Sequence, residues 1–312
     1  MPGLQAGQTS VVRFEHVSKW YGDIVAVSDI SFGIAPGVTG LLGPNGAGKS
    51  TCLKMMAGLL KPSSGSVTIG GESVRGGPKV YRRLGLVGEQ EHVYPFLTGI
   101  EFVRMNAIMQ GLPNADAATA RAIALVEMGE AAPRQIGGYS KGMRQRIKVA
   151  AALVHDPETI LLDEPLNGTD PVQRAELISL MRRLGEEGRT VVVSSHVLSE
   201  VERFAQNILV IVNGKLAAAG DYRAIRDRMD EHPRAVRLRA NDPRRLASAL
   251  VGDRATAAVR FDEDGWLVAE TGDVRAFSAA LPRLAREAGV RLLEVQPTDD
   301  SLASVFAYLV GR

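Results

Sequence analysis

At positions 43–50 the chain reads Gly43-Pro44-Asn45-Gly46-Ala47-Gly48-Lys49-Ser50, which matches the phosphate-binding pattern G-x-x-x-x-G-K-[ST] at every fixed position. An apolar run at residues 38–42 precedes it and predicts a buried strand, and residues 49–56 are typical of the start of a helix. This strand–loop–helix order is the setting that the pattern requires. The stretch therefore predicts an α/β fold organised around the phosphates of a nucleotide.

The residue types in this loop fit that chemistry. Glycines allow consecutive backbone N–H groups to turn toward one anion, and the N-terminus of the following helix adds a partial positive charge. Lys49 would reach the terminal phosphates, Ser50 would offer its hydroxyl to Mg²⁺, and Thr51 would make a secondary phosphate contact.

Two adjacent carboxylates, Asp163 and Glu164, end a predicted apolar strand that begins at Thr159. Ligands of open α/β sheets bind at this edge, and successive side chains on a strand point apart. Asp163 would therefore hold Mg²⁺, directly or through water, and Glu164 would polarise the attacking water. Such carboxylate pairs are also frequent without a catalytic role, so the phosphate loop is what favours this interpretation.

Two further residues have both a functional and an ordinary structural interpretation. His196 follows a predicted strand at residues 190–194 and would share the ligand edge, although a histidine at a strand end is usually a hydrogen-bonded loop residue. Tyr21 lies in a predicted turn at residues 18–23, where it could stack on a purine or simply be exposed.

Length and composition indicate a soluble globular chain. Its 312 residues suggest two domains, and 45% apolar residues suffice for ordinary cores. No apolar run approaches the roughly 18 residues needed to cross a bilayer, and residues 1–10 are interpreted as a disordered tail rather than a signal or anchor. A single cysteine, Cys52, excludes an internal disulfide and favours packing over redox control. The formal charge of +2 argues neither for nor against nucleic acid.

The remaining patterns before residue 230 divide into a sheet and a helical insertion. Residues 11–17 and 24–34 predict two strands of a half-buried sheet, and residues 66–69 predict a short strand. A buried strand at residues 84–88 ends at Glu89-Gln90, after which residues 98–110 and 115–128 have helical periodicity. We therefore expect a helical insertion at about residues 91–154.

Taken in order, these motifs resemble the ATP-binding subunit of an ABC transporter over residues 11–229. The matching segments are residues 43–50 (Walker A), Gln90 (glutamine loop), residues 139–145 (signature), residues 159–164 (Walker B), His196 (switch histidine) and Tyr21 (adenine-stacking aromatic). The resemblance implies a P-loop NTPase of the ABC ATPase type, with an antiparallel β subdomain and a helical insertion.

The resemblance also implies roles for single residues. ATP would be hydrolysed with Mg²⁺, with Glu164, His196 and Gln90 as catalytic residues. The metal would be held by Ser50, Gln90 and Asp163. Contacts to ATP would come from Tyr21, Gly43, Pro44, Asn45, Gly46, Ala47, Gly48, Lys49, Ser50 and Thr51.

In this family the signature of one subunit closes over the nucleotide held by the other, so the working unit is a head-to-tail dimer. The residues that would act in trans are Ser140, Lys141, Gly142 and Met143 of the signature, with Asp170 in the D-loop. Two residues depart from the family pattern: Lys141 replaces the first signature glycine, and Thr169 replaces the leucine that usually precedes the D-loop aspartate. Neither departure removes a magnesium ligand or the candidate base.

The chain has one Walker A motif and one signature, so the second half of each site would come from another chain. A homodimer is the simpler interpretation because both half-sites look intact, and a heterodimer stays open. A separate membrane-spanning permease would bind the transported substance. The chain itself would be peripheral at the cytoplasmic face of the membrane.

Residues 233–312 predict a second domain, which follows a polar linker at residues 230–233. The pattern alternates as strand, helix, strand, strand, helix, strand, which is the ferredoxin-like order. Residues 262–265 are interpreted as a solvated hairpin turn rather than an acidic metal loop. Residues 297–302 and the short helix after them resemble the C-terminal extension of ABC-2 exporter ATPases, which favours export over import.

Features of the sequence oppose two functions other than transport. Soluble ABC-type ATPases that act on DNA or ribosomes usually have two ATPase halves, zinc-binding cysteines or a coiled-coil insertion, and the 90 residues between Lys49 and Tyr139 are too few for a coiled-coil arm. A nucleotide-sensing regulator without turnover is opposed by Glu164. We therefore expect an ATP-driven exporter subunit without a nucleic acid partner.

Overall fold

The computed structural model describes residues 11–90, 93–221, 224–225, 234–262, 264–297 and residue 306. The chain divides into two compact units, Met1–Asp221 and Tyr222–Arg312, each of which is described by itself. The predicted tail at residues 1–10, the linker at residues 230–233 and the stretch at residues 298–302 lie outside the described residues.

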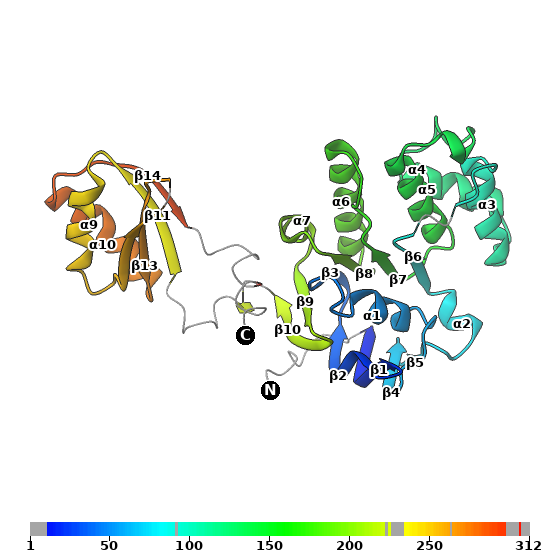
Figure 1. Cartoon of the computed structure of the whole chain (residues 1–312). Coiled ribbons are helices and arrows are strands. Elements are labelled where there is room, and N and C mark those ends of the chain that lie inside the picture. The colour runs from blue at the N-terminus through cyan, green and yellow to red at the C-terminus, as the bar shows by residue number, and fades with distance from the viewer. Residues whose placement is uncertain are drawn as a thin grey trace. The chain divides into compact units, whose positions relative to one another are not determined.

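The central sheet of the first unit has six strands, in the spatial order Lys215–Asp221 (β10), Asn207–Val212 (β9), Gly37–Leu42 (β3), Thr190–Ser195 (β8), Thr159–Asp163 (β7) and Leu84–Val87 (β6) (Figure 1). The strands from β9 to β6 run parallel, and β10 pairs antiparallel with β9 at one edge. β7 and β8 are buried along their whole length, as expected of parallel strands with helices on both faces.

Helices that pack on this sheet include Lys49–Met56 (α1), Pro171–Glu186 (α6) and Leu198–Phe204 (α7). The start of α6 is fixed by Asp170, whose side chain accepts hydrogen bonds from two backbone N–H groups, and by Pro171 at the first helical position. α6 buries Leu177, Leu180 and Leu184, and this spacing forms one apolar stripe along the helix. No helix in the described part of the chain is long and apolar enough to cross a membrane.

A second sheet is antiparallel, in the spatial order Ile24–Ile34 (β2), Val12–Tyr21 (β1), Ser64–Ile69 (β4) and Glu72–Ser73 (β5). Phe14 and Phe32 stack across β1 and β2 with ring centroids 4.4 Å apart. These rings share one hydrophobic cluster with Cys52 of α1 and Leu41 of the central sheet. Burial raises the pKa of Cys52 to about 12, which agrees with a packing role for this thiol.

The turn predicted at residues 18–23 is shorter in the structure. β1 continues to Tyr21, which pairs with Ile24, so the turn contains only Gly22 and Asp23. Gly22 has φ of +57°, a conformation that two-residue hairpin turns require and that glycine adopts without strain. Tyr21 is therefore the last residue of a strand rather than part of a loop.

The helical insertion contains Gly99–Met109 (α3), Ala115–Leu125 (α4) and Lys141–Leu153 (α5), which Figure 1 shows gathered beside β6. It also contains a one-turn helix at Ile136–Gly138, and the short helix Pro78–Tyr81 (α2) precedes β6. Thr98 caps α3 through reciprocal hydrogen bonds with Glu101. α4 ends before the predicted Met128, because Glu127 takes a left-handed conformation (φ +56°) that cannot continue a helix.

The second unit comprises Arg234–Ala240 (β11), Pro243–Val251 (α9), Ala258–Phe261 (β12), Leu267–Thr271 (β13), Val274–Glu287 (α10) and Leu292–Pro297 (β14). Its sheet is antiparallel in the order β12-β13-β11-β14, which confirms the predicted ferredoxin-like fold. α9 and α10 lie together beside this sheet (Figure 1). They contribute Leu246, Leu250, Phe277 and Leu281 to one hydrophobic core with it.

Asp262 closes the hairpin between β12 and β13. Its carboxylate accepts hydrogen bonds from the backbone N–H groups of Asp264 and Trp266, and Arg237 forms ion pairs with Asp262 and Asp264. Across the described residues, no three His, Cys, Asp or Glu side chains gather as a metal site.

Candidate active site

The loop between β3 and α1 has a backbone path that only glycine permits at two positions. A β-carbon on Gly43 would lie 2.2 Å from the carbonyl oxygen of Ile211, and one on Gly48 would lie 2.7 Å from that of Ala26. Gly48 also has φ of +107° and gives α1 no side-chain cap. The first N–H groups of α1 therefore have no capping side chain and are available to an anion.

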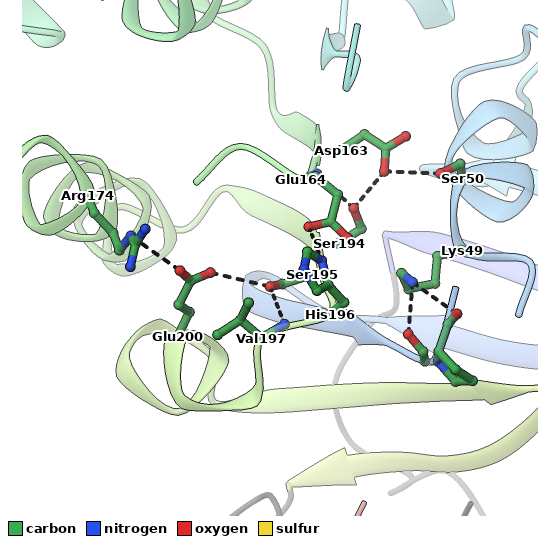
Figure 2. A network of polar contacts seen from close by, with 12 residues as sticks. Lys49, Ser50, Asp163, Glu164, Arg174, Ser194, Ser195, His196, Val197 and Glu200 are labelled. Atoms are coloured by element: carbon green, nitrogen blue, oxygen red, sulfur yellow. Dashed lines mark hydrogen bonds and ion pairs between the residues drawn. The ribbon is translucent and has the colours of Figure 1, made fainter. Parts of the chain in front are cut away.

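Lys49 is buried in this loop, with 7% of its surface exposed. Its Nζ donates hydrogen bonds to the carbonyl oxygens of Gly43 at 2.8 Å and Pro44 at 3.2 Å (Figure 2). The ammonium thus lies across its own loop, where phosphate oxygens could replace carbonyls as its acceptors. Within the loop Ala47 is buried, whereas Asn45 and Gly46 are exposed.

Asp163 lies at the C-terminal end of β7 and faces Ser50 of α1. Ser50 Oγ is 3.3 Å from Asp163 Oδ1, and Ser194 Oγ of β8 donates to the same oxygen at 2.6 Å (Figure 2). A carboxylate and a hydroxyl are oxygen ligands of the kind that Mg²⁺ prefers, and Mg²⁺ takes its remaining ligands from water and phosphates. The residues present therefore fit the metal.

Glu164 turns away from Asp163 because its own backbone is left-handed, with φ of +50°. Its N–H donates to Ser194 Oγ at 2.9 Å, and its Oε2 lies 2.9 Å from Nδ1 of His196 (Figure 2). The Glu164 side chain is 12% exposed and that of His196 is 46% exposed. The two adjacent carboxylates thus have different partners, as predicted, and the Glu164–His196 pair stays open to solvent on the histidine side.

For the other residues predicted at the ATP site, the structure gives a position but no hydrogen bond with Ser50 or Asp163 among the described residues. Tyr21 is 49% exposed at the end of β1, with Lys19 Nζ 5.1 Å from its ring centroid. Thr51 lies in the first turn of α1. Gln90 is exposed just beyond β6, and within the described residues no hydrogen bond joins its side chain to Ser50 or Asp163.

The residues predicted to act in trans lie on α5 and at the start of α6. Ser140 caps α5 by accepting a hydrogen bond from Met143 N at 3.2 Å. A β-carbon on Gly142 would lie 1.6 Å from Oε1 of Gln173, so α5 and α6 approach closely here. In the described part of the chain, no hydrogen bond joins these residues to the phosphate loop.

Lys141, which departs from the family pattern, lies against the loop before α6. A β-carbon on Gly168 would come within 2.5 Å of the Lys141 side chain, so the lysine stem covers this glycine. The other departure, Thr169, is buried and donates a hydrogen bond from Oγ1 to Leu166 O at 2.7 Å.

Comparisons with known proteins match the chain to one family. A family model described as ABC transporter matches residues 27–167. The bacitracin transport ATP-binding protein of Bacillus licheniformis is 31% identical over an alignment of 315 positions, which covers 97% of this chain and 98% of that protein. The chain belongs to the ABC transporter ATP-binding family. The resemblance inferred from the motifs is therefore confirmed.

Other relatives and solved structures extend the match within the ABC family. The daunorubicin/doxorubicin resistance ATP-binding protein of Streptomyces peucetius is 32% identical over 310 residues, which cover 97% of this chain and 93% of that protein. A solved ATP-binding subunit of an ABC transporter has a TM-score of 0.65 and 26% identity over 70% of this chain and 93% of that one. A dimeric cassette bound to ADP and Pi has a TM-score of 0.62 and 25% identity over 67% of this chain and 98% of that one.

Sequence reasoning missed Ser194, which connects the carboxylate of Asp163 to the backbone of Glu164 in this ABC ATPase. Its hydroxyl donates to Asp163 and accepts from the N–H of Glu164. Asp163 and Ser194 are paired in the parallel register of β7 and β8. A polar residue near the end of the strand at residues 190–195 was therefore the one signal in the sequence that could have indicated Ser194. Lys148 of α5 was also missed, and no pattern in the sequence separates it from an exposed helix lysine.

Proposed function

We propose that this ABC ATPase hydrolyses ATP at composite sites of a head-to-tail dimer and thereby drives export through a separate membrane-spanning permease. The observation that carries the proposal is the Ser50–Asp163 and Glu164–His196 arrangement at the sheet edge, beside the loop that holds Lys49. Relatives named for bacitracin transport and drug resistance support export. The alternative, a soluble ABC-type ATPase acting on DNA or ribosomes, is not favoured by these relatives.

In this mechanism each residue has a distinct task. Lys49 and the loop N–H groups bind the terminal phosphates of ATP, and Ser50 and Asp163 would hold Mg²⁺, with Gln90 as a further ligand. The metal would supply positive charge that neutralises the phosphates. Glu164 accepts the proton of the attacking water as general base, and His196 holds the Glu164 carboxylate through the 2.9 Å contact.

The second half of each site comes from the partner subunit in this proposal. Ser140, Lys141, Gly142 and Met143, with Asp170, make no hydrogen bond to the phosphate loop of their own subunit among the described residues. A partner placed head to tail would bring them to the nucleotide, and a homodimer supplies two equal sites. ATP would then stabilise the closed dimer over the open one.

The membrane partner is proposed to dock on the helical insertion. Exposed apolar side chains gather on and just before α3: Tyr94, Phe96, Ile100, Ile108 and Met109. A surface of this kind suits a short helix from the permease, which would hold the chain at the cytoplasmic face of the membrane. The transported substance would contact the permease, so its identity is not encoded in this chain.

Mixing two inactive variants tests the composite sites. Lys49→Ala disables the phosphate loop, and Gly142→Asp disables the signature. In a head-to-tail dimer the mixed pair places both lesions in one site and leaves the other intact, so hydrolysis should partly recover. Absence of recovery at every mixing ratio would contradict composite sites that work independently.

The structure improves this test, because a side chain on Gly142 would meet Gln173 of its own subunit. The signature lesion is therefore best made in a Gln173→Ala background, which removes the obstructing side chain. Gln173→Ala alone is the matched control and should hydrolyse ATP at close to the wild-type rate.

A further inference from the structure

Lys148 is a buried lysine in the middle of α5 to which the proposed mechanism gives no task. Only 7% of its surface is exposed. Its Nζ donates hydrogen bonds to the carbonyl oxygens of Gly88 at 2.7 Å and Gln90 at 2.9 Å, and to Oε1 of Gln145 at 3.3 Å. Two of these three acceptors belong to the backbone of the glutamine loop.

A buried ammonium is costly unless its donors are satisfied, and hydrogen bonds from a charged donor are stronger than neutral ones. A methionine would fill a similar volume without this requirement. Because the acceptors at Gly88 and Gln90 are main-chain oxygens, Lys148 fixes the path of the chain between them. The contacts therefore act on the position of Gln90 itself.

The segment that Lys148 holds begins beside the catalytic edge of the sheet. Val87 of β6 pairs in register with Leu162 of β7, so Gly88 lies level with Asp163. On the other side, α5 begins directly after Ser140 of the signature. Ser140 and Lys148 are separated by roughly 12 Å along one helix, at about 1.5 Å per residue.

We infer that Lys148 is a positioning residue that ties the backbone of the glutamine loop to the signature helix. Through this tie, Gln90 and Ser140 move as one body when the dimer closes, and Gln90 reaches the metal site only while Lys148 holds its carbonyl. The inference rests on the proposed role of Gln90 as a Mg²⁺ ligand. A purely structural Lys148 would affect folding stability and nothing else.

The test is the Mg²⁺ concentration that gives half-maximal ATP hydrolysis at saturating ATP. Lys148→Met should raise this concentration by about tenfold, as should Gln90→Ala, and the double variant should be no worse than either single variant because both lesions act on one contact. Nucleotide affinity measured without Mg²⁺ should stay at the wild-type value. Lys148→Arg keeps the charge and the donors and should restore part of the Mg²⁺ response.

Arg121→Met is the matched control. Arg121 Nη2 lies 3.5 Å from the carbonyl oxygen of Val154, just after the C-terminal end of α5. Arg121 is therefore also a cationic side chain that contacts a main-chain carbonyl next to α5. Its loss should leave the Mg²⁺ response unchanged. If Lys148→Met is insoluble, Lys148→Gln, which keeps an amide NH₂ as donor group and loses the charge, is measured in its place.

A wild-type Mg²⁺ response in the Lys148 variants, or effects that add to those of Gln90→Ala, would overturn the inference. A wild-type Mg²⁺ response in Gln90→Ala would also overturn it, because Gln90 would then not be at the metal. ATP hydrolysis by the wild-type protein would survive each of these outcomes. Failure of the inference is therefore distinguishable from failure of the proposed function.

Discussion

Lys49 donates to two carbonyl oxygens of its own loop, and in the nucleotide complex it should donate to phosphate oxygens instead. Lys49→Ala removes a charge-assisted contact and should weaken ATP binding by roughly 10- to 100-fold. A fluorescent ATP analogue titrated into the purified variant measures this change. Lys54→Ala, an exposed lysine on the same helix, is the control and should bind normally. Equal affinities for the two variants would mean that Lys49 is wrongly assigned.

Ser194 satisfies Asp163 and the N–H of Glu164 at once, and it is completely buried. Ser194→Ala leaves both groups without this partner, so kcat should fall by about tenfold, equivalent to about 1.4 kcal/mol. Ser195→Ala removes the neighbouring hydroxyl, which accepts from Val197 N at 3.0 Å, and should have a smaller effect on kcat. Steady-state kinetics of both variants would refute this role for Ser194 if the two kcat values were equal.

At the residue scale, the sequence predicted Ser50 and Asp163 as ligands of one metal because each belongs to a recognisable motif, and the structure places the two side chains 3.3 Å apart. It did not predict Ser194, because a serine at a strand end acquires meaning only once the register of β7 and β8 is known. The contacts of Lys148 were hidden for the same reason, since its partners lie 60 and 58 residues away in the chain.

His155 follows α5 and joins it to the start of β6, because its Nε2 lies 3.0 Å from the carbonyl oxygen of Leu84. Burial lowers the pKa of His155, so the folded state disfavours the charged imidazole. Between this lowered pKa and the ordinary histidine pKa of about 6.5 the unfolded chain binds more protons than the folded chain, so the free energy of unfolding should fall as pH falls through this range.

Urea unfolding at pH 7.5 and pH 5.5 measures this decrease. His155→Gln keeps a donor for Leu84 O but cannot titrate, so the part of the decrease that depends on His155 should disappear. The same pH dependence in both proteins would mean that His155 does not control it.

At the element scale, the helix predicted to start at residues 49–56 is observed as α1. α9 begins at a proline after an aspartate cap, and these two residues are clear signals of a helix start. Errors arose where one backbone conformation decided the boundary. Gly22 is left-handed and allows a two-residue turn, so β1 extends to Tyr21. Glu127 is also left-handed, and α4 ends before it, earlier than predicted.

The two compact units have separate sheets and separate hydrophobic cores, so each could fold alone. A chain that ends at Arg228 should therefore fold and bind ATP, while its ATP-induced dimer should be weaker than that of the whole chain. Sedimentation of both chains with the Glu164→Gln change and saturating ATP compares the dimer affinities. An unchanged affinity would exclude a dimerisation role for the second unit, and an insoluble truncated chain would contradict its independence.

At the scale of the whole molecule, motif order predicted the ABC ATPase fold and the ferredoxin-like unit. The assembly could not be derived in the same way, because the signature and the phosphate loop need a second chain to meet. The sequence likewise does not identify the transported substance, because in our proposal that substance binds to the permease.

Glu164 is the proposed general base of a working ATPase. Hydrolysis and ATP affinity should be measured together for Glu164→Gln, with Glu158→Gln as control, because Glu158 immediately precedes β7 at the opposite end from Glu164. We expect wild-type ATP affinity in both variants, near-normal turnover in Glu158→Gln, and turnover reduced by ~10²–10⁴-fold in Glu164→Gln. Near-normal hydrolysis by Glu164→Gln would contradict the role of Glu164 as general base.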